Sequence, residues 1–208
     1  MYPRKLAKST KNTQCNLLKQ RLDRGENCWY YNARAFVSTV SSFITTFFND
    51  TATTEIYTVT LNPALDKTVE IPNLALDTVN RITKMRTDPG GKGINVSKVI
   101  AKLGGTSKAI GILAGNSGKA IQDALDGEGL AHNFRFVPGE TRTNLKVIDP
   151  ENHTNTDINE PGIEVDAPEL TALLYDLLKE LKRGDIVVLA GSLPKGAPKD
   201  TYYTWVES

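Results

Sequence analysis

The residues best suited to chemistry lie in one glycine-rich stretch near the middle of the chain, Thr87–Val99, which reads TDPGGKGINVSKV. Four loop residues stand directly before a run with helical spacing: Gly90, Gly91, Lys92 and Gly93. A glycine loop that opens a helix lets backbone N–H groups approach an anionic or hydroxylated ligand, and Lys92 adds positive charge. Asn95, in the first helical turn, can donate to and accept from sugar hydroxyls. A tight turn that only caps the helix, with Lys92 solvated, explains this stretch alone equally well.

Three further polar residues stand at predicted strand ends or turns: Asp66, Arg142 and Asn159. A carboxylate accepts hydrogen bonds from hydroxyl groups, and a guanidinium binds a phosphate through two parallel hydrogen bonds. Arg142 alone could equally pair with Glu140 at the surface. Together with the glycine loop, one acid, two cations and two amides favour a phosphorylated polyol as the ligand.

Other kinds of functional site find no support in the sequence. His132 and His153 are isolated from each other and from ligand residues at metal-binding spacing, so we expect no metal site. The GxSxG pattern of a hydrolase nucleophile and the GxxxxGK[ST] phosphate loop do not occur in the 208 residues. After residue 50, acidic residues outnumber basic ones, which argues against nucleic-acid binding.

From Ile56 onward, strand patterns alternate with helix patterns. We expect strands at 56–61, 69–72, 79–82, 108–114, 134–137, 143–148, 154–158 and 186–190, and helices at 96–103, 119–125, 167–181 and 200–206. The apolar run Ile186–Ala190 is typical of a strand buried on both faces in a parallel sheet. This order predicts an α/β fold with a mostly parallel sheet and a small β appendage. Asp66 would then follow the carboxyl end of the first strand, where open α/β sheets bind ligands.

Residues 1–55 differ in character from the rest of the chain. Residues 1–50 contain eight lysines and arginines against three acidic residues, and they hold both cysteines. Asn49–Thr58, NDTATTEIYT, resembles the translation of a sequencing-library adapter, which indicates a chimeric reading frame. We therefore expect residues 1–55 to be an unrelated leader, disordered or artefactual. Because the apolar-rich run Ala35–Phe48 is too short to span a bilayer and the body lacks cysteine, we expect a soluble, cytoplasmic protein that does not bind membranes.

Five motifs stand in the order and spacing of one enzyme family: LNPALDKTV, PGGKGINVSKV, GETRTNLKV, TDINEPG and GDIVVLAGSLPKG. They resemble the ribokinase-like sugar kinases of the phosphofructokinase B type, and the resemblance runs from Ile56 to Ser208. TDINEPG together with TRTNLKV is most similar to the bacterial 1-phosphofructokinase branch. The tagatose-6-phosphate kinase branch, which shares GETR and GSLPKG, is the close alternative.

The resemblance implies a three-layer α/β/α domain with a small β-sheet lid, drawn from residues 69–87 and 136–159. Sugar hydroxyls are expected to contact the loop Gly90–Gly93 and two side chains, those of Asp66 and Asn95. The substrate phosphate is expected to face Arg142, with Asn144 in support. The further candidates are Arg81 and Lys92 for the phosphate, Asn159 in the lid, and Gly191 and Ser192 at the sheet edge beneath the substrate.

The activity implied by the resemblance is the phosphorylation of fructose 1-phosphate to fructose 1,6-bisphosphate with ATP and Mg²⁺, by a homodimer joined through the lid. The family's catalytic base is an Asp in a GAGD motif, which does not occur in the 208 residues. We therefore expect residues 56–208 to be the N-terminal, substrate-binding part of the kinase domain, inactive alone and without bound ATP or Mg²⁺. A non-catalytic sugar-phosphate-binding module is the alternative from another functional class.

Overall fold

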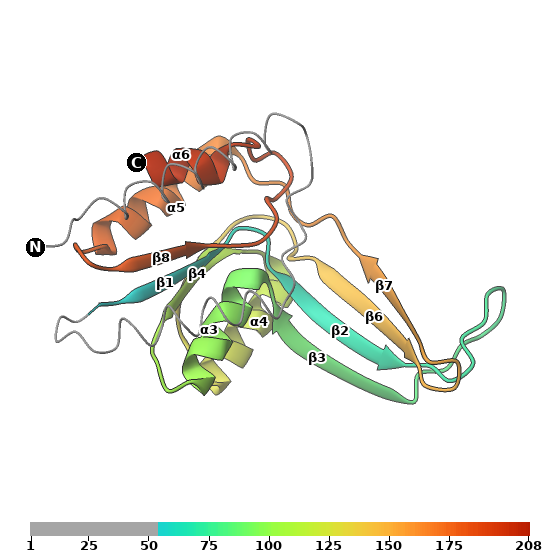
Figure 1. Cartoon of the computed structure of the whole chain (residues 1–208). Coiled ribbons are helices and arrows are strands. Elements are labelled where there is room, and N and C mark those ends of the chain that lie inside the picture. The colour runs from blue at the N-terminus through green and yellow to red at the C-terminus, as the bar shows by residue number, and fades with distance from the viewer. Residues whose placement is uncertain (1–53) are drawn as a thin grey trace, which may run out of the picture. The chain divides into compact units, whose positions relative to one another are not determined.

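Two four-stranded sheets organise residues 54–208, the part of the chain that the computed structural model describes (Figure 1). In the first sheet all strands are parallel, in the order β5-β4-β1-β8. Its strands are β1 (Ile56–Thr60), β4 (Lys108–Leu113), β5 (Ala131–Phe136) and β8 (Ile186–Leu189). β1 is buried along its whole length, because it has a strand on each side and helices over both faces.

Helices cover both faces of this parallel sheet (Figure 1). They are α3 (Lys92–Lys102), α4 (Gly115–Gly127), α5 (Ala167–Glu180) and α6 (Thr201–Glu207). On one face, α3 and α4 enclose an apolar cluster around Ile94 and Ile121. On the other face, α5 and α6 enclose a second cluster around Leu173 and Trp205. The three-layer α/β/α arrangement predicted from the sequence is therefore confirmed.

The capping residue and the leucine spacing of helix α5 explain why these residues form a helix. Asp166 caps its start by accepting a hydrogen bond from the backbone N–H of Glu169 at 3.0 Å, and a proline occupies the first turn. Leu170, Leu173 and Leu177 recur on one face and are buried against the sheet. The predicted helix 167–181 is confirmed to within one residue at its end.

The second sheet has the order β3-β2-β6-β7 and projects from one end of the first (Figure 1). Its strands are β2 (Ala64–Glu70), β3 (Lys84–Gly90), β6 (Thr143–Asp149) and β7 (Thr154–Asn159). β2 pairs antiparallel with β3 and parallel with β6, and β6 pairs antiparallel with β7. This sheet is the predicted β appendage, and we call it the lid.

One carboxylate organises the turn between β6 and β7. Asp149 accepts hydrogen bonds from the backbone N–H groups of Asn73 and Leu74, at 3.0 and 2.8 Å, and from the side-chain amide of Asn152 at 2.8 Å. The Asn152 side chain, together with backbone N–H donors, lowers the pKa of Asp149 from its ordinary 3.8 to about 2, although desolvation opposes the shift. Asp149 therefore ties the loop after β2 to the β6–β7 hairpin.

Two predicted lid strands are placed wrongly. Residues 79–82 form no strand but part of a loop, in which Val79 and Ile82 are 78% and 53% exposed, because no neighbouring strand lies beside them. The strand lies instead at Lys84–Gly90, where all seven residues pair with β2. The strand predicted at 69–72 begins at Ala64, directly after Pro63, so that Asp66 lies inside β2 and not in a loop.

Three other expectations need adjustment. β8 is half-buried and not buried on both faces, because among the described residues it is an edge strand of its sheet. α4 begins at Gly115, four residues before its predicted start, and β5 begins at Ala131. The predicted leader lies, up to residue 53, outside the described residues. Among residues 54–208, none of the helices combines the length and apolar character that crossing a membrane requires.

Candidate functional site

A cavity of about 510 Å³ opens between the lid and helix α3. All four lid strands contribute side chains to its wall, and α3 contributes Asn95 and Lys98. Four of the residues predicted from the sequence line it together: Asp66, Asn95, Asn144 and Asn159. The structure therefore brings together side chains that lie up to 93 positions apart in the chain, which makes this cavity the candidate site.

The strand register explains why one face of the lid is polar. Side chains alternate between the two faces of a sheet, so cross-strand neighbours line the cavity in two rows. The first row is Asp88, Asp66, Asn144 and Asn159. The second row is Arg86, Thr68, Lys146 and Asp157. The same alternation places Val69, Met85 and Val147 on the opposite face, which they share with Lys67 and Thr87.

Asp66 and Asn144 form the centre of the first row. The side-chain amide of Asn144 donates to Oδ1 of Asp66 at 2.9 Å. The other polar atom of this side chain, Oδ1 of Asn144, is buried and has no hydrogen-bond partner among the described residues. Because a buried acceptor without a donor is costly, this atom indicates a place for a ligand hydroxyl. Gly90 leaves room for the pair, since a Cβ there would lie 2.2 Å from Oδ2 of Asp66.

Thr60 holds the glycine loop at the start of α3. Its hydroxyl oxygen accepts a hydrogen bond at 3.1 Å from the backbone N–H of Ile94, one of the donors that a helix start leaves without a partner. Gly91, at the N-cap, has a φ of 125°, which favours glycine. Gly93 packs its backbone against Thr60, where a Cβ would lie 2.4 Å from the hydroxyl oxygen. The loop thus keeps the positive end of α3 close to Asp66 and the cavity.

Arg142 lies at the base of the lid and is not one of the residues that line this cavity. Its guanidinium donates to the carbonyl oxygens of Asn62 at 3.1 Å and of Pro63 and Glu160 at 3.4 Å, and to the hydroxyl of Ser192 at 3.4 Å. These contacts join the β1–β2 connection, the end of β7 and the segment after β8. Burial lowers the pKa of Arg142, and the negative charge of Asp66 opposes that shift.

The sequence leaves open a surface ion pair between Arg142 and Glu140. In the structure, Glu140 has other partners. Its carboxylate accepts hydrogen bonds from the backbone N–H groups of Ser117 at 2.6 Å and Asn116 at 3.1 Å, at the start of α4. These bonds, that from Ser117 above all, lower the pKa of Glu140. Thr141 adds a reciprocal pair of hydrogen bonds with the backbone of Ala114, at 2.8 and 2.9 Å. The segment that carries Arg142 is therefore fixed to the β4–α4 junction.

The remaining predicted residues are not among those that line the cavity. Gly191 lies near Lys92, since a Cβ on Gly191 would be 3.8 Å from the Cβ of Lys92. Ser192 accepts hydrogen bonds from Asn62 and Arg142. Arg81 is exposed in the loop between β2 and β3 and does not line the cavity.

Sequence reasoning missed four cations that line the cavity: Lys67, Arg86, Lys98 and Lys146. For Lys146 the signal was available, because the alternation in TNLKV places it on the same strand face as Asn144. Arg86 could not be found without the position of β3. Lys98 is one helical turn after Asn95 on α3, so helix phase was a signal for it.

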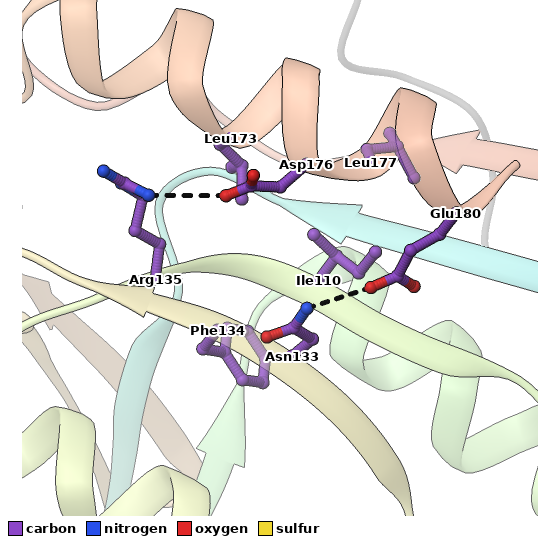
Figure 2. A pocket seen from close by; sticks show the side chains of 8 residues that line it. All are labelled: Ile110, Asn133, Phe134, Arg135, Leu173, Asp176, Leu177 and Glu180. Carbon is purple, nitrogen blue, oxygen red and sulfur yellow. Dashed lines mark hydrogen bonds and ion pairs between the residues drawn. The ribbon is translucent and has the colours of Figure 1, made fainter.

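A second, smaller cavity of about 190 Å³ lies between β5 and α5 (Figure 2). Arg135 forms ion pairs with Glu169 and with Asp176, the latter at 3.4 Å, and Asn133 donates to Glu180 at 3.1 Å. Because these polar groups are partnered with one another between strand and helix, we interpret this cavity as a packing contact and not as a ligand site.

Comparison with known proteins identifies the family. Residues 59–207 match the model of the pfkB family carbohydrate kinases. The chain belongs to this family. It is 42% identical over 147 residues to the 1-phosphofructokinase of Xanthomonas campestris pv. campestris, and 40% identical over 147 residues to that of Bacillus subtilis. The two alignments cover 70% and 71% of this chain but 46% and 47% of those relatives, so the chain spans about half of their length.

Solved structures of kinases in the same family confirm the fold. The phosphofructokinase-2 of Escherichia coli, solved in complex with fructose-6-phosphate, superposes with a TM-score of 0.70 at 30% identity, over 74% of this chain and 50% of that one. A possible 1-phosphofructokinase from Thermotoga maritima superposes with a TM-score of 0.68 at 38% identity, over 74% and 49%. The predicted resemblance to ribokinase-like sugar kinases of the phosphofructokinase B type is therefore confirmed.

Proposed function

We propose that residues 56–208 are the sugar-phosphate-binding part of a 1-phosphofructokinase, the kinase that converts fructose 1-phosphate to fructose 1,6-bisphosphate in the cytoplasm. The observation that carries the proposal is the Asp66–Asn144 pair in the cavity wall, with its buried acceptor that has no partner among the described residues. The relatives named 1-phosphofructokinase, at 38 to 42% identity, favour this substrate. Tagatose 6-phosphate is the alternative substrate, because its kinases share the GETR and GSLPKG motifs.

In this proposal the first row of the lid binds the sugar hydroxyls. The carboxylate of Asp66 and Oδ1 of Asn144 accept hydrogen bonds from hydroxyl groups, and the amide of Asn95 both donates and accepts. A hydrogen bond to an ionised group contributes about 1.5–3 kcal/mol, more than a neutral one, so Asp66 dominates the orientation of the sugar. The backbone at Gly90–Gly93 lets the ring approach closely, and Asn159 extends the row.

Arg142 is proposed to face the substrate phosphate, as the resemblance implies. Three of its four contacts are 3.4 Å long, beyond the usual range for a strong hydrogen bond, so a phosphate oxygen can replace them as acceptor. Lys92 and Arg81 stay proposed as additional cations near the site. Gly191 and Ser192 are proposed to lie beneath the substrate, next to Arg142.

For the complete enzyme we propose ATP and Mg²⁺, as membership of a carbohydrate kinase family implies. Within residues 54–208 no group of three or more His, Cys, Asp or Glu side chains is arranged to hold a metal ion. In-line phosphoryl transfer also needs a base at the attacking hydroxyl, and the GAGD motif that supplies it in the family does not occur in this sequence. We propose that the 208-residue chain binds the sugar phosphate without phosphorylating it.

A homodimer through the lid is a further part of the proposal. The lid face opposite the cavity carries an apolar cluster that includes Val69 and Val147, and its neighbours Met85 and Ile158 are 59% and 57% exposed. Apolar side chains exposed on one sheet face favour association with a second copy. Light scattering should show a dimer that Met85→Lys converts to a monomer.

The second candidate function is a sugar-phosphate-binding module without catalysis. It is favoured by one observation: among the described residues, all those that line the cavity lie between Asp66 and Asn159. Phosphorylation of fructose 1-phosphate by the natural full-length gene product would exclude this candidate.

Titration calorimetry of the 208-residue chain with fructose 1-phosphate tests the proposed function. We expect saturable binding that Asp66→Asn weakens by about 10- to 100-fold, from the free energy of a charged hydrogen bond. Asp123→Asn, on the exposed side of α4, is the matched control and should bind like the unaltered chain. Undetectable binding by the unaltered chain, or undiminished binding by Asp66→Asn, contradicts the proposal.

A further inference from the structure

The face of β1 that α3 covers carries two hydroxyl groups, although it lies inside the domain. Tyr57, Val59 and Leu61 belong to the apolar cluster under α5 and α6, on the other face of the strand. Because side chains alternate along a strand, Thr58 and Thr60 face α3, and they are 0% and 1% exposed. A valine has nearly the shape of a threonine and would avoid the cost of burying a hydroxyl, so packing does not explain these two residues.

Both hydroxyls instead form hydrogen bonds with α3. Oγ1 of Thr60 accepts from the backbone N–H of Ile94 at 3.1 Å. Oγ1 of Thr58 shares a hydrogen bond of 2.7 Å with Oγ of Ser97, which is itself 0% exposed. The two attachment points are three residues apart, which is about 4.5 Å along the helix. Two directed bonds at this spacing fix both the height of α3 on the sheet and its rotation about its own axis.

A third hydroxyl extends the pair to the next strand. Ser107, directly before β4, donates to Oγ of Ser97 at 2.9 Å. Since a hydroxyl both accepts and donates, Ser97 can pass its own proton on to the bond with Thr58. Hydrogen bonds depend on direction, whereas apolar contacts do not. The hydroxyls therefore define one orientation of α3, which the apolar layer around them does not do.

The hydroxyl of Ser97 and the side chain of Asn95 lie on opposite sides of α3, because two helical residues are about 200° apart. Asn95 lines the cavity, and Ser97 does not. A helix with its side chains is about 10–12 Å across, so a rotation of about 10° moves the end of the Asn95 side chain by about 1 Å. A binding group has to be held to within about 0.5 Å of its productive place. The rotation of α3 therefore decides whether Asn95 meets a ligand.

We propose that Ser97 is a positioning residue of the sugar site that acts through Thr58. The buried hydroxyl pair fixes the rotation of α3 and thereby the place of Asn95 in the cavity wall. This inference rests on the proposed function for its ligand, and it adds to that function two residues that do not line the cavity. Thr60 holds the start of the same helix.

The test removes both hydroxyls at once from the 208-residue chain. Thr58→Val/Ser97→Ala keeps the shape of the pair closely and leaves neither hydroxyl buried without the other, so Tm should stay within about 4 °C of that of the unaltered chain. Calorimetry should show that fructose 1-phosphate binds about tenfold more weakly, from loss of the two hydrogen bonds that Asn95 can make. Thr58→Ser keeps the hydroxyl and should bind to within about twofold.

Thr201→Val on α6 is the matched control. It also removes a buried threonine hydroxyl, one that donates to the carbonyl oxygen of Pro198 at 2.6 Å. It should lower Tm without changing the affinity, because that carbonyl oxygen loses its donor far from α3 in the sequence. A second readout needs no ligand: in a ¹⁵N NMR spectrum, the side-chain amide resonances of Asn95 should shift in the double variant and not in the control.

The outcomes separate the inference from the proposed function. Unaltered affinity in the double variant, an equal loss in Thr58→Ser, or a fall in Tm beyond about 4 °C overturns the inference and leaves the proposed function standing. Unmoved Asn95 resonances in the double variant overturn it as well. Failure of the unaltered chain to bind fructose 1-phosphate overturns the proposed function, and the Asn95 resonances then decide alone whether Ser97 positions α3.

Discussion

Replacing Gly90 with alanine is the sharpest test of how the site is built. Gly90 ends β3 and lies beside Asp66, so a Cβ would be 2.2 Å from Oδ2 and 2.4 Å from Cγ of that carboxylate. The atoms in the way belong to a side chain, which must rotate and thereby break the 2.9 Å hydrogen bond from Asn144. The substitution therefore removes the carboxylate from its place without changing its charge.

The expected cost in stability is modest and the expected cost in binding is large. Overpacking with one methyl group costs about 1–3 kcal/mol, and we expect the lower half of that range because a side chain and not the backbone gives way. For the described part of the chain, this corresponds to a fall in Tm of roughly 2–8 °C. Loss of the charged hydrogen bonds that we propose between Asp66 and the sugar should weaken fructose 1-phosphate binding by about 10- to 100-fold.

A double-mutant cycle with Asp66→Ala separates the clash from other effects. Urea unfolding should show that Gly90→Ala costs much less in the Asp66→Ala background, because the side chain in the way is gone. Gly127→Ala is the control, since a Cβ there meets nothing within 4 Å and alanine is the better helix former. An equal cost of Gly90→Ala in both backgrounds would refute the reasoning.

Three other predictions follow from particular contacts. The pKa of Asp149 in the folded protein is about 2, against an ordinary value of 3.8. Its contribution to stability is therefore complete above about pH 4 and is lost as the pH falls towards 2. In a measurement of Tm against pH, Asp149→Asn should flatten the curve in this range. Gly111→Ala should destabilise by about 3 kcal/mol in urea unfolding, because its Cβ would lie 2.0 Å from the carbonyl oxygen of Thr60, a backbone atom in β1 that cannot rotate away. Glu140→Ala should accelerate hydrogen exchange of the Ser117 amide, whose acceptor it removes; unchanged exchange would mean that the helix start does not depend on this carboxylate.

Much of the parallel sheet and its helices could be predicted because their signals are local. The leucine spacing in Ala167–Glu180 and the apolar run in Ile186–Leu189 each need one element to be recognised. The lid could be predicted only in part. Lys84–Gly90, KMRTDPG, has few strand-forming residues and becomes a strand because β2 offers it backbone partners. Val79–Ile82 has the better strand composition and no such partner.

The residues of the candidate site also differ in whether their sequence signals are local. Asp66, Asn95 and Asn144 could be predicted because they lie in motifs that are continuous in the sequence. Arg142 was predicted as a site residue, but three of its four acceptors are backbone carbonyl oxygens, from two separate segments, and backbone contacts cannot be read from residue types. Lys98 depends on how α3 packs against the lid, which is decided by tertiary contacts and not by residue type.

The confinement of the cavity to residues between Asp66 and Asn159 has an evolutionary consequence. Both polar rows of the lid and the contributing turns of α3 are encoded by one continuous stretch, whereas α5, β8 and α6 lie outside it. A single exchange of this stretch between two related proteins would transfer at once all the described side chains that line the cavity. Under the proposed function, the side chains of this cavity can therefore be inherited together, separately from α5, β8 and α6.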